Sequence, residues 1–387
     1  MANERKLPII LIPGIQGTKL YNVNLDDFST HWSGVKKFYT NIHKLKLQRD
    51  GINDIGVETI IERADVENMA YSEIINYLKS KGYRVFIFGY DWRKSNVDSA
   101  RSLKKYVEVL RNKLNIGEFN FLTHSMGGLV LSAYLKILDD AERNKIVSKA
   151  IFTVPPFLGS IEASFNLVIG KSRLFNSSDD FRKIARTFPA VYELLPVFED
   201  AYKFENPITE ANYDPFNFYT YWQQVANADR EDTIDKHEFM AYRLSKVREV
   251  RDQNNLIFDL STCSPEFRKK CIVVCGGNED TKSHIKVHDR RDHFKNFFDY
   301  EAIKEDEEGD GTVPHASASI FKDSVQTIRV GKKTLESWAD SRMTGPDWHA
   351  FFLNNGRVQN VLQRFLKGDT HREDWYKSAG GRIEKIT

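Results

Sequence analysis

The stretch Phe119–Val130, FNFLTHSMGGLV, is the most informative part of this 387-residue chain. An apolar run typical of a buried strand leads into a turn of small residues, and an apolar run with helical spacing follows. A serine at the tip of a strand–turn–helix unit is lifted clear of the sheet, which is the arrangement of a nucleophile elbow. Gly127 and Gly128 would let the helix pack closely on the strand. The stretch therefore predicts Ser125 as a nucleophile.

The usual elbow pattern, G-x-S-x-G, is broken here at its first glycine, which is Thr123. The context of a strand before the serine and a helix after it still favours the elbow. The alternative is that Ser125 only caps an ordinary helix, because serine is also a common N-cap residue. The sequence favours the first interpretation and leaves the second open.

Short apolar runs alternate with amphipathic stretches over most of the chain, a pattern typical of a parallel sheet covered by helices. The runs lack polar alternation, as expected for strands that are buried on both faces. The predicted strands are Leu7–Ile12, Tyr83–Phe88, Phe119–Thr123, Lys149–Val154, Lys270–Cys275 and Ser324–Val330. The predicted helices are Met69–Ser80, Asp98–Leu114, Met126–Leu138 and Val358–Leu366.

The strand pattern stops between Phe157 and Lys269, where aromatic and helical segments replace it. The run Lys270–Cys275 then resumes the sheet. We therefore expect one core, residues 1–156 and 270–387, with residues 157–269 inserted as a cap or lid. The aromatic residues of this insertion form either the core of the cap or an acyl-chain groove, and the sequence leaves both open; they include Phe216, Phe218, Tyr219, Tyr221 and Trp222.

A serine hydroxyl needs a histidine base, and the base needs a carboxylate that fixes its tautomer. In α/β-hydrolases these residues follow the chain order Ser, acid, His. Asp310, in the turn GDGTVP just before the last predicted strand, fits the acid, with a solvated surface charge as the alternative. His349 follows that strand and is the preferred base, while His315 is the alternative. His124 adjoins the nucleophile, and we expect it to support the sheet.

The oxyanion of a tetrahedral intermediate requires backbone N–H donors, one from the residue after the nucleophile and one from an early loop. Met126 supplies the first by its position. Ile15, in the glycine-containing segment LIPGIQG at residues 11–17, is the predicted second donor. These residues together predict an α/β-hydrolase fold, with a mostly parallel central sheet, helices on both faces and an inserted cap.

Composition and the remaining motifs limit which partners and cofactors we expect. The chain carries 56 Lys and Arg against 54 Asp and Glu, and this net charge of +2 gives no overall field for nucleic acid. His284, His288 and His293 lie among basic residues that would repel a cation, so we expect no metal and no cofactor, with a metal site there as the alternative. Three cysteines are too few for a disulfide framework. Reduced thiols and the absence of an N-terminal secretory pattern predict a cytoplasmic protein.

Six motifs in one order carry a resemblance to a known family. They are PIILIPGIQGTKL, FGYDWRKS, THSMGG, TVPPFLGSIEA, GDGTVP and WHAFFLNNGRVQNVL, which span most of the chain. The chain resembles the lecithin:cholesterol acyltransferase family, which includes lysosomal phospholipase A2 and phospholipid:diacylglycerol acyltransferases. The resemblance implies a triad of Ser125, Asp310 and His349 and an oxyanion hole at Ile15 and Met126, in agreement with the assignment from the residues.

The resemblance also gives an interpretation of the motif Asp91-Trp92-Arg93. It suggests Trp92 as the floor of an acyl pocket, and Asp91 with Arg93 as an ion pair of structural rather than catalytic importance. The animal members are secreted or lysosomal and carry disulfides near the lid, which this chain lacks. The resemblance therefore suggests a microbial cytoplasmic relative and does not transfer lipid specificity.

The leading hypothesis for function is a serine hydrolase that cleaves carboxylic esters, in particular lipid or phospholipid acyl esters, through an acyl-enzyme on Ser125. The alternative is an acyltransferase that passes the acyl group from a phospholipid to an alcohol. A third hypothesis is a catalytically silent scaffold used for binding. The expected partners are a lipid or other ester substrate and a membrane surface touched transiently by the cap, and the sequence gives no oligomeric state.

Overall fold

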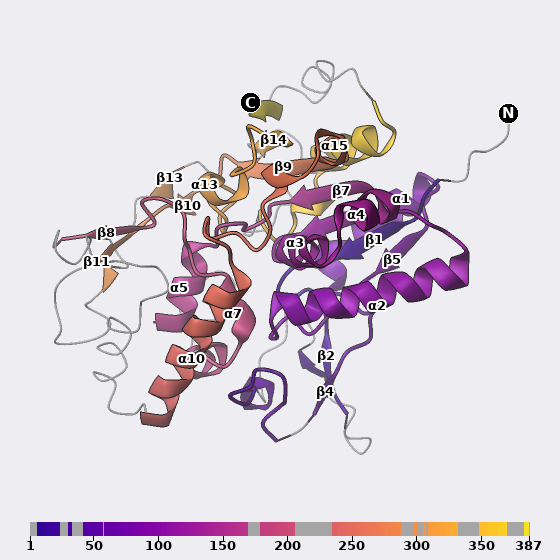
Figure 1. The fold of residues 1–387 in the computed structure, drawn as a ribbon. Helices are drawn as coiled ribbons and strands as arrows, with labels where there is room; N and C mark the ends of the chain where they lie inside the picture. The colour runs from indigo at the N-terminus through magenta and orange to yellow at the C-terminus, as the bar shows by residue number, and fades with distance from the viewer. Residues whose placement is uncertain are drawn as a thin grey trace, which may run out of the picture.

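The structure of the protein is a computed structural model that describes most of the chain (Figure 1). The described residues are 6–23, 30–32, 42–56, 58–168, 179–205, 234–287, 298–299, 305–306, 309–331, 348–369 and 383–386. The expected cap aromatics from Phe216 to Trp222 lie outside these ranges.

A seven-stranded sheet forms the centre of the molecule, in the strand order β15-β14-β9-β7-β6-β1-β5 (Figure 1). Its strands are β1 (Ile9–Ile12), β5 (Val85–Ile87), β6 (Phe119–His124), β7 (Val147–Thr153), β9 (Cys271–Gly277), β14 (Gln326–Gly331) and β15 (Ile383–Ile386). All neighbours are parallel except β15, which pairs antiparallel with β14. The six predicted strands are confirmed, with bounds that differ by at most two residues, and β15 was not predicted.

The four predicted helices are present and lie against the sheet. They are α1 (Asn68–Ser80), α2 (Asn96–Leu114), α3 (Gly127–Ile137) and α15 (Gly356–Leu366). Successive side chains of a strand point to opposite faces. Accordingly, Ile10 and Ile12 of β1 join a buried cluster with α2 and α3, while Ile9 and Leu11 join a second cluster with α1 and α15. The sheet is therefore covered on both faces, which explains its unbroken apolar runs.

Between β7 and β9 the described chain is mainly helical. Its elements are α5 (Ile161–Val168), α6 (Asp179–Ala185), α7 (Pro189–Glu193), β8 (Tyr202–Phe204), α10 (Ile234–Val250), η2 (Leu260–Thr262) and α11 (Pro265–Arg268). Figure 1 shows α5, α7 and α10 grouped beside the sheet. β8 pairs in parallel with β11 (Ile285–Val287), which lies beyond β9 in the chain. The inserted segment thus shares a small sheet with a later segment, and the division of the chain at residue 270 stays a prediction.

The remaining described elements are short. They are β2 (Leu20–Asn22), β3 (Thr30–Trp32), η1 (Ile42–Leu45), β4 (Thr59–Ile60), α4 (Asp140–Ile146), β10 (Thr281–Lys282), β12 (Phe298–Asp299), β13 (Glu305–Asp306), α13 (His315–Ala318) and η3 (Phe352–Asn354). Within the described ranges, none of the helices has the length and apolar character needed to span a bilayer.

Candidate active site

Ser125 lies in the turn between the end of β6 and the start of α3, as the sequence predicts. Its φ of 52° is unusual for a residue with a side chain, and such strain is commonly stored at functional sites. Its amide donates to the carbonyl of Thr153 on β7, at 2.9 Å, which helps to hold the turn. A Cβ at Gly127 would lie 2.4 Å from the carbonyl oxygen of Ile12, so only glycine allows this approach of helix to strand.

Thr123, which stands where the elbow pattern has its first glycine, is fully buried in β6. Its hydroxyl donates to the carbonyl of Ile151 at 3.3 Å, and its own carbonyl accepts from the hydroxyl of Thr153. The neighbouring strand therefore accommodates a side chain at this position. This explains how the turn forms without the first glycine.

Three side chains from separate parts of the chain meet at this turn. Nδ1 of His349 is 2.7 Å from Oδ2 of Asp310, and Nε2 of the same ring is 2.8 Å from Oγ of Ser125. A carboxylate oxygen only accepts, so Nδ1 carries the proton and Nε2 can accept the serine proton. All three residues are buried. The geometry thus brings together the predicted nucleophile, base and acid.

The carboxylate of Asp310 is fixed from two sides. Its Oδ1 accepts from the amides of Thr312 at 3.0 Å and Val313 at 2.7 Å, which leaves Oδ2 for the histidine. The interpretation of Asp310 as a solvated surface charge is wrong, because the residue is only 1% exposed. His315 begins α13, whereas the ring bonded to Asp310 belongs to His349.

The loop after β1 lies against the elbow. A Cβ at Gly14 would lie 3.0 Å from Cβ of Ser125, which shows how closely the loop approaches. The amide of Gly14 donates to the hydroxyl of Tyr71 at 2.8 Å. By contrast, the amides of Ile15 and Met126 have no acceptor among the residues that the structure describes. These two N–H groups are therefore available as donors, as an oxyanion hole requires.

The predicted ion pair of Asp91 and Arg93 is present. Nη2 of Arg93 is 2.7 Å from Oδ2 of Asp91, and Nη1 is 2.6 Å from Oδ1 of Asp54. Burial alone would raise the pKa of Asp91, but the adjacent guanidinium outweighs it and lowers that pKa. Nη1 also donates to the carbonyl of Leu45. Arg93 therefore fastens the segment around residues 45–54 to the end of the sheet, a structural role.

Trp92 is fully buried next to this ion pair. Its Nε1 donates to the carbonyl of Thr18 at 3.0 Å, and its ring meets Phe188 edge to face with centroids 5.8 Å apart. These contacts join the loop between β1 and β2 to the start of α7. The predicted role of Trp92 in an acyl pocket stays a prediction.

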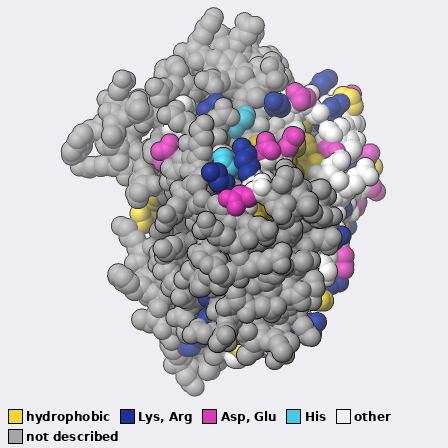
Figure 2. Space-filling view, turned by 90° about the vertical axis from the view of Figure 1, so that its left-hand side faces the viewer, with side chains coloured by type: hydrophobic (Ala, Val, Ile, Leu, Met, Phe, Trp, Pro, Cys, Tyr) yellow, Lys and Arg dark blue, Asp and Glu magenta, His cyan; other side chains and the backbone are white. Residues whose placement is uncertain are grey.

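Of the three histidines weighed as an alternative metal site, only His284 lies within the described ranges, and His288 and His293 lie outside them. Nδ1 of His284 is 3.3 Å from the hydroxyl of Ser283, and Lys282 forms an ion pair with the buried Glu162. Across the described ranges, no three His, Cys, Asp or Glu side chains are placed to hold a metal ion. On the side of the molecule that Figure 2 shows, described histidine, basic and acidic side chains lie close together, so the described surface there is mixed in charge.

The three cysteines are buried free thiols, as predicted. Burial raises the pKa of Cys263 to about 11 and raises the pKa values of Cys271 and Cys275 further. The two thiols of β9 therefore stay protonated at neutral pH, and no reactive thiolate arises from them.

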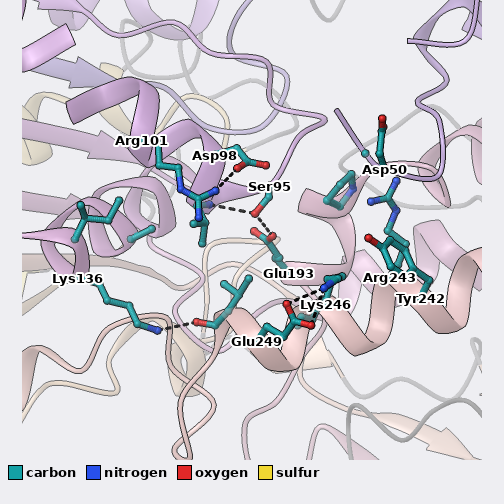
Figure 3. Close-up of a pocket in the computed structure, with 17 residues that line it drawn as sticks. Asp50, Ser95, Asp98, Arg101, Lys136, Glu193, Tyr242, Arg243, Lys246 and Glu249 are labelled. Carbon is teal, nitrogen blue, oxygen red and sulfur yellow. Dashed lines mark hydrogen bonds and ion pairs between the residues drawn. The ribbon is translucent and has the colours of Figure 1, made fainter. Parts of the chain in front are cut away.

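A cavity of about 430 Å³ lies away from the elbow, between α2, α7 and α10 (Figure 3). Figure 3 shows two ion pairs among its lining side chains, Arg101 with Asp98 and Lys246 with Glu249. The carboxylate of Glu193 accepts from the hydroxyl of Ser95 at 2.6 Å and from the Asn96 side chain at 2.7 Å. The contacts in this cavity connect α7 to the first turn of α2.

Two residues near the elbow stand out only in the structure. His124 was expected to support the sheet, but its Nε2 is 2.9 Å from the carbonyl oxygen of His349. Tyr71, on α1, was not predicted at all, and its hydroxyl is 2.9 Å from Nδ1 of His124. Its position in an amphipathic helix resembles that of an ordinary core residue, so the sequence contains no signal for this contact.

A mostly parallel sheet with helices on both faces and a serine turn after a central strand defines the α/β-hydrolase fold. The solved structure of the Tle4–Tli4 complex shares this fold, with a TM-score of 0.59 and 15% identity over 93% of this chain and 98% of that chain. The Bacillus licheniformis lipase BlEst2 aligns with a TM-score of 0.39 and 12% identity, over 89% of this chain and 91% of that one.

Within this fold the chain belongs to the lecithin:cholesterol acyltransferase family, whose profile matches residues 54–335. The resemblance inferred from the six motifs is thereby confirmed. A curated relative, phospholipase A(1) LCAT3 of Arabidopsis thaliana, is 31% identical over 125 residues, which are 30% of this chain. The aligned part spans 28% of that relative's length.

Proposed function

We propose that this protein cleaves carboxylic esters, in particular lipid or phospholipid acyl esters, through an acyl-enzyme on Ser125. The observation that carries the proposal is the continuous hydrogen-bonded series from Asp310 through His349 to Ser125 at the elbow turn. Membership of the lecithin:cholesterol acyltransferase family supports a lipid acyl group as the part of the substrate that is transferred.

In the proposed first step, Oγ of Ser125 attacks the ester carbonyl carbon while Nε2 of His349 takes the serine proton. The carbonyl π bond breaks, and the oxygen becomes an oxyanion that the amides of Ile15 and Met126 bind. The intermediate then collapses, the bond to the alcohol breaks, and His349 donates its proton to the leaving alkoxide oxygen. Asp310 holds the histidine tautomer and stabilises the imidazolium. The product of this step is an acyl-serine and a free alcohol.

In the second step, His349 takes a proton from a water molecule, which attacks the acyl carbon. Collapse of this second intermediate returns the proton to Ser125 and releases the carboxylic acid. An alcohol in place of water would give a new ester by the same steps, and the family profile supports this acyltransferase alternative. The two functions differ only in which hydroxyl reaches the acyl-enzyme. The silent-scaffold hypothesis has no such support, since it leaves the Ser125–His349–Asp310 geometry without a purpose.

Further parts of the proposal concern the surroundings of the site. We propose that the segment between β7 and β9 covers the acyl chain, with Trp92 beneath it, and touches a membrane surface when substrate enters. We also propose a cytoplasmic location, which the unbridged thiols of Cys263, Cys271 and Cys275 support. Cell fractionation would test this location, and recovery only from the medium or an oxidising compartment would contradict it.

The experiment for function combines a substrate series with a matched variant. Purified protein is given esters of increasing acyl length and phospholipids with a labelled acyl chain, each with and without a long-chain alcohol. We expect labelled fatty acid as the product with water alone, and a labelled ester in addition if the alcohol competes. Ser125→Ala should abolish both products. Ser132→Ala, a change at a buried serine on α3, should leave them unchanged. Activity retained in Ser125→Ala would contradict the proposal.

A further inference from the structure

His124 lies next to the site, because it is the last residue of β6 and directly precedes Ser125. Its ring lies beside that of His349, with centroids 5.3 Å apart. The hydrogen bond between the two residues, however, runs from the ring of His124 to the backbone of His349. Nε2 of His124 is 2.9 Å from the backbone carbonyl oxygen of His349. His124 is therefore bonded to the backbone that carries the proposed base.

The direction of these hydrogen bonds follows from the partners. A carbonyl oxygen only accepts, so Nε2 of His124 carries a proton and donates it. Burial and the neighbouring His349 lower the pKa of His124 to about 3, so the ring is neutral at physiological pH. Nδ1 is then an acceptor, and the hydroxyl of Tyr71, 2.9 Å away, donates to it.

The series continues from Tyr71 to the loop after β1. Burial raises the pKa of Tyr71, so its hydroxyl keeps its proton, and its oxygen accepts from the amide of Gly14 at 2.8 Å. A Cβ at residue 17 would lie 2.8 Å from that hydroxyl oxygen, so Gly17 leaves the space that the hydroxyl occupies. Gly14 directly precedes Ile15. Three hydrogen bonds, through the side chains of Tyr71 and His124, thus connect the proposed oxyanion loop to the backbone of the proposed base.

We propose that Tyr71 and His124 are positioning residues, which set the histidine base and the Ile15 amide relative to each other around the reacting carbon. This inference rests on the proposed function of Ser125, His349 and Ile15. Neither residue takes part in proton transfer, because the single ring proton of His124 is donated to the carbonyl of His349 and the hydroxyl proton of Tyr71 is donated to Nδ1 of His124. Displacement of catalytic groups by about 1 Å can cost on the order of 10²-fold in rate. The effect should therefore fall on the chemical steps rather than on substrate binding.

Tyr71→Phe is the most direct test, because it removes both hydrogen bonds and keeps the ring in the core. We expect kcat to fall about 10-fold, KM to change less than about twofold, and the rate of inactivation by a fluorophosphonate to fall with kcat. Tyr106→Phe is the control. It likewise removes one tyrosine hydroxyl, but this hydroxyl lies on α2 and donates to the backbone carbonyl of Ile87 on β5. We expect its kcat to be unchanged.

His124→Leu and His124→Gln add a rescue. The leucine variant lacks the donor to His349, and we expect its kcat to fall about 10²-fold. Glutamine can place an amide N–H near the position of Nε2, so we expect it to recover at least several-fold in kcat over leucine. A purely structural role would give the two variants activities that follow their thermal stabilities instead.

The outcomes separate this inference from the proposed function. If Ser125→Ala is inactive while Tyr71→Phe and His124→Leu retain wild-type kcat, the positioning inference is overturned and the function stands. If Ser125→Ala is active, the proposed function itself is wrong. If His124→Leu does not fold, Tyr71→Phe decides by the same kcat and inactivation criteria, with Tyr106→Phe as its reference.

Discussion

Two buried carboxylates, Asp310 and Glu193, have much in common and very different surroundings. Asp310 accepts from two loop amides and from His349, whose ring continues to the hydroxyl of Ser125. Glu193 accepts from the hydroxyl of Ser95 and from the amide and side chain of Asn96, at the first turn of α2. The first series ends at a nucleophile beside two available amides. The second ends at donors that are fixed in a helix terminus.

The comparison teaches that burial, hydrogen bonding and a nearby cavity do not by themselves mark a catalytic site. The cavity of about 430 Å³ adjoins Glu193, where charged side chains pair with one another. Burial raises the pKa of Glu193, while the donors of Ser95 and Asn96 work in the opposite direction. A carboxylate at a helix N-terminus stabilises the helix through its free amides and dipole. Glu193 therefore belongs to the junction of α2 and α7, and Asp310 to the chemistry.

The largest effect should come from Ser125→Ala. Loss of the attacking oxygen should lower kcat by about 10⁴–10⁶-fold, because one member of a triad typically accounts for this much. The midpoint of thermal unfolding should not fall, because alanine removes only the serine hydroxyl and leaves the packing of Gly127 against β1 unchanged. Ester hydrolysis and calorimetry on the same preparation check both parts. Retention of a tenth of the activity would contradict the claim that the region of Asp310 and Ser125, unlike that of Glu193, is catalytic.

Asp310→Asn should have the next largest effect. The amide can donate to Nδ1 of His349 and so favour the wrong tautomer, and we expect kcat to fall by about 10⁴-fold. His315→Ala is the matched control, because it changes a histidine that lies five positions after Asp310, in α13, while the ring bonded to Oδ2 of Asp310 belongs to His349. A severe loss in His315→Ala with a mild loss in Asp310→Asn would contradict the assignment of acid and base.

Glu193→Ala should show the opposite profile. It leaves the donors of Ser95 and Asn96 without their acceptor, and we expect the free energy of unfolding to fall by about 3 kcal/mol. The kcat of the folded protein should stay within about twofold. Urea unfolding and ester hydrolysis measure the two quantities. A loss of kcat comparable to that of Asp310→Asn, in protein that is still folded, would show that the two carboxylates share a catalytic role.

The smallest effects are the pH dependences, and the two regions should differ in sign. The pKa of His124 is lowered from 6.5 to about 3, so the unfolded chain binds more protons between these values. Stability from this residue is present above pH 6.5 and is lost progressively as pH falls toward 3. The raised pKa of Glu193 gives the reverse, stability that is present below pH 4.5 and is lost as pH rises through the folded pKa.

Urea unfolding from pH 4 to 7 can separate these contributions. Relative to the wild type, His124→Gln should lose less stability on acidification, while Glu193→Gln should lose less on the rise from pH 4.5. Matching curves for the wild type and both variants would contradict the assigned directions.

Much of the central region could be predicted from sequence because its signals are local. Buried parallel strands appear as unbroken apolar runs, and the elbow shows its strand, turn and helix within twelve residues, from Phe119 to Val130. The positions of Asp310 and His349 follow from chain order, so these two residues were found without knowledge of contacts. The structure then brings them within hydrogen-bonding distance of each other and of Ser125.

Other features depend on contacts that no local pattern contains. Tyr71 precedes His124 by 53 positions, and Glu193 follows Asn96 by 97. Strand β15 is only four residues long, and it pairs antiparallel with β14 at the edge of the sheet. The antiparallel edge and the α2–α7 junction are therefore results of tertiary packing, which the periodicity of a sequence does not specify.

The central claim is that Ser125 is the nucleophile of this protein, activated by His349 and Asp310. Reaction with a fluorophosphonate, followed by digestion and mass spectrometry of the peptides, tests it most directly. We predict a single modified residue, Ser125, with labelling absent in Ser125→Ala, strongly slowed in Asp310→Asn and unchanged in Glu193→Gln. An adduct on a different residue, or labelling that persists in Ser125→Ala, would contradict the claim.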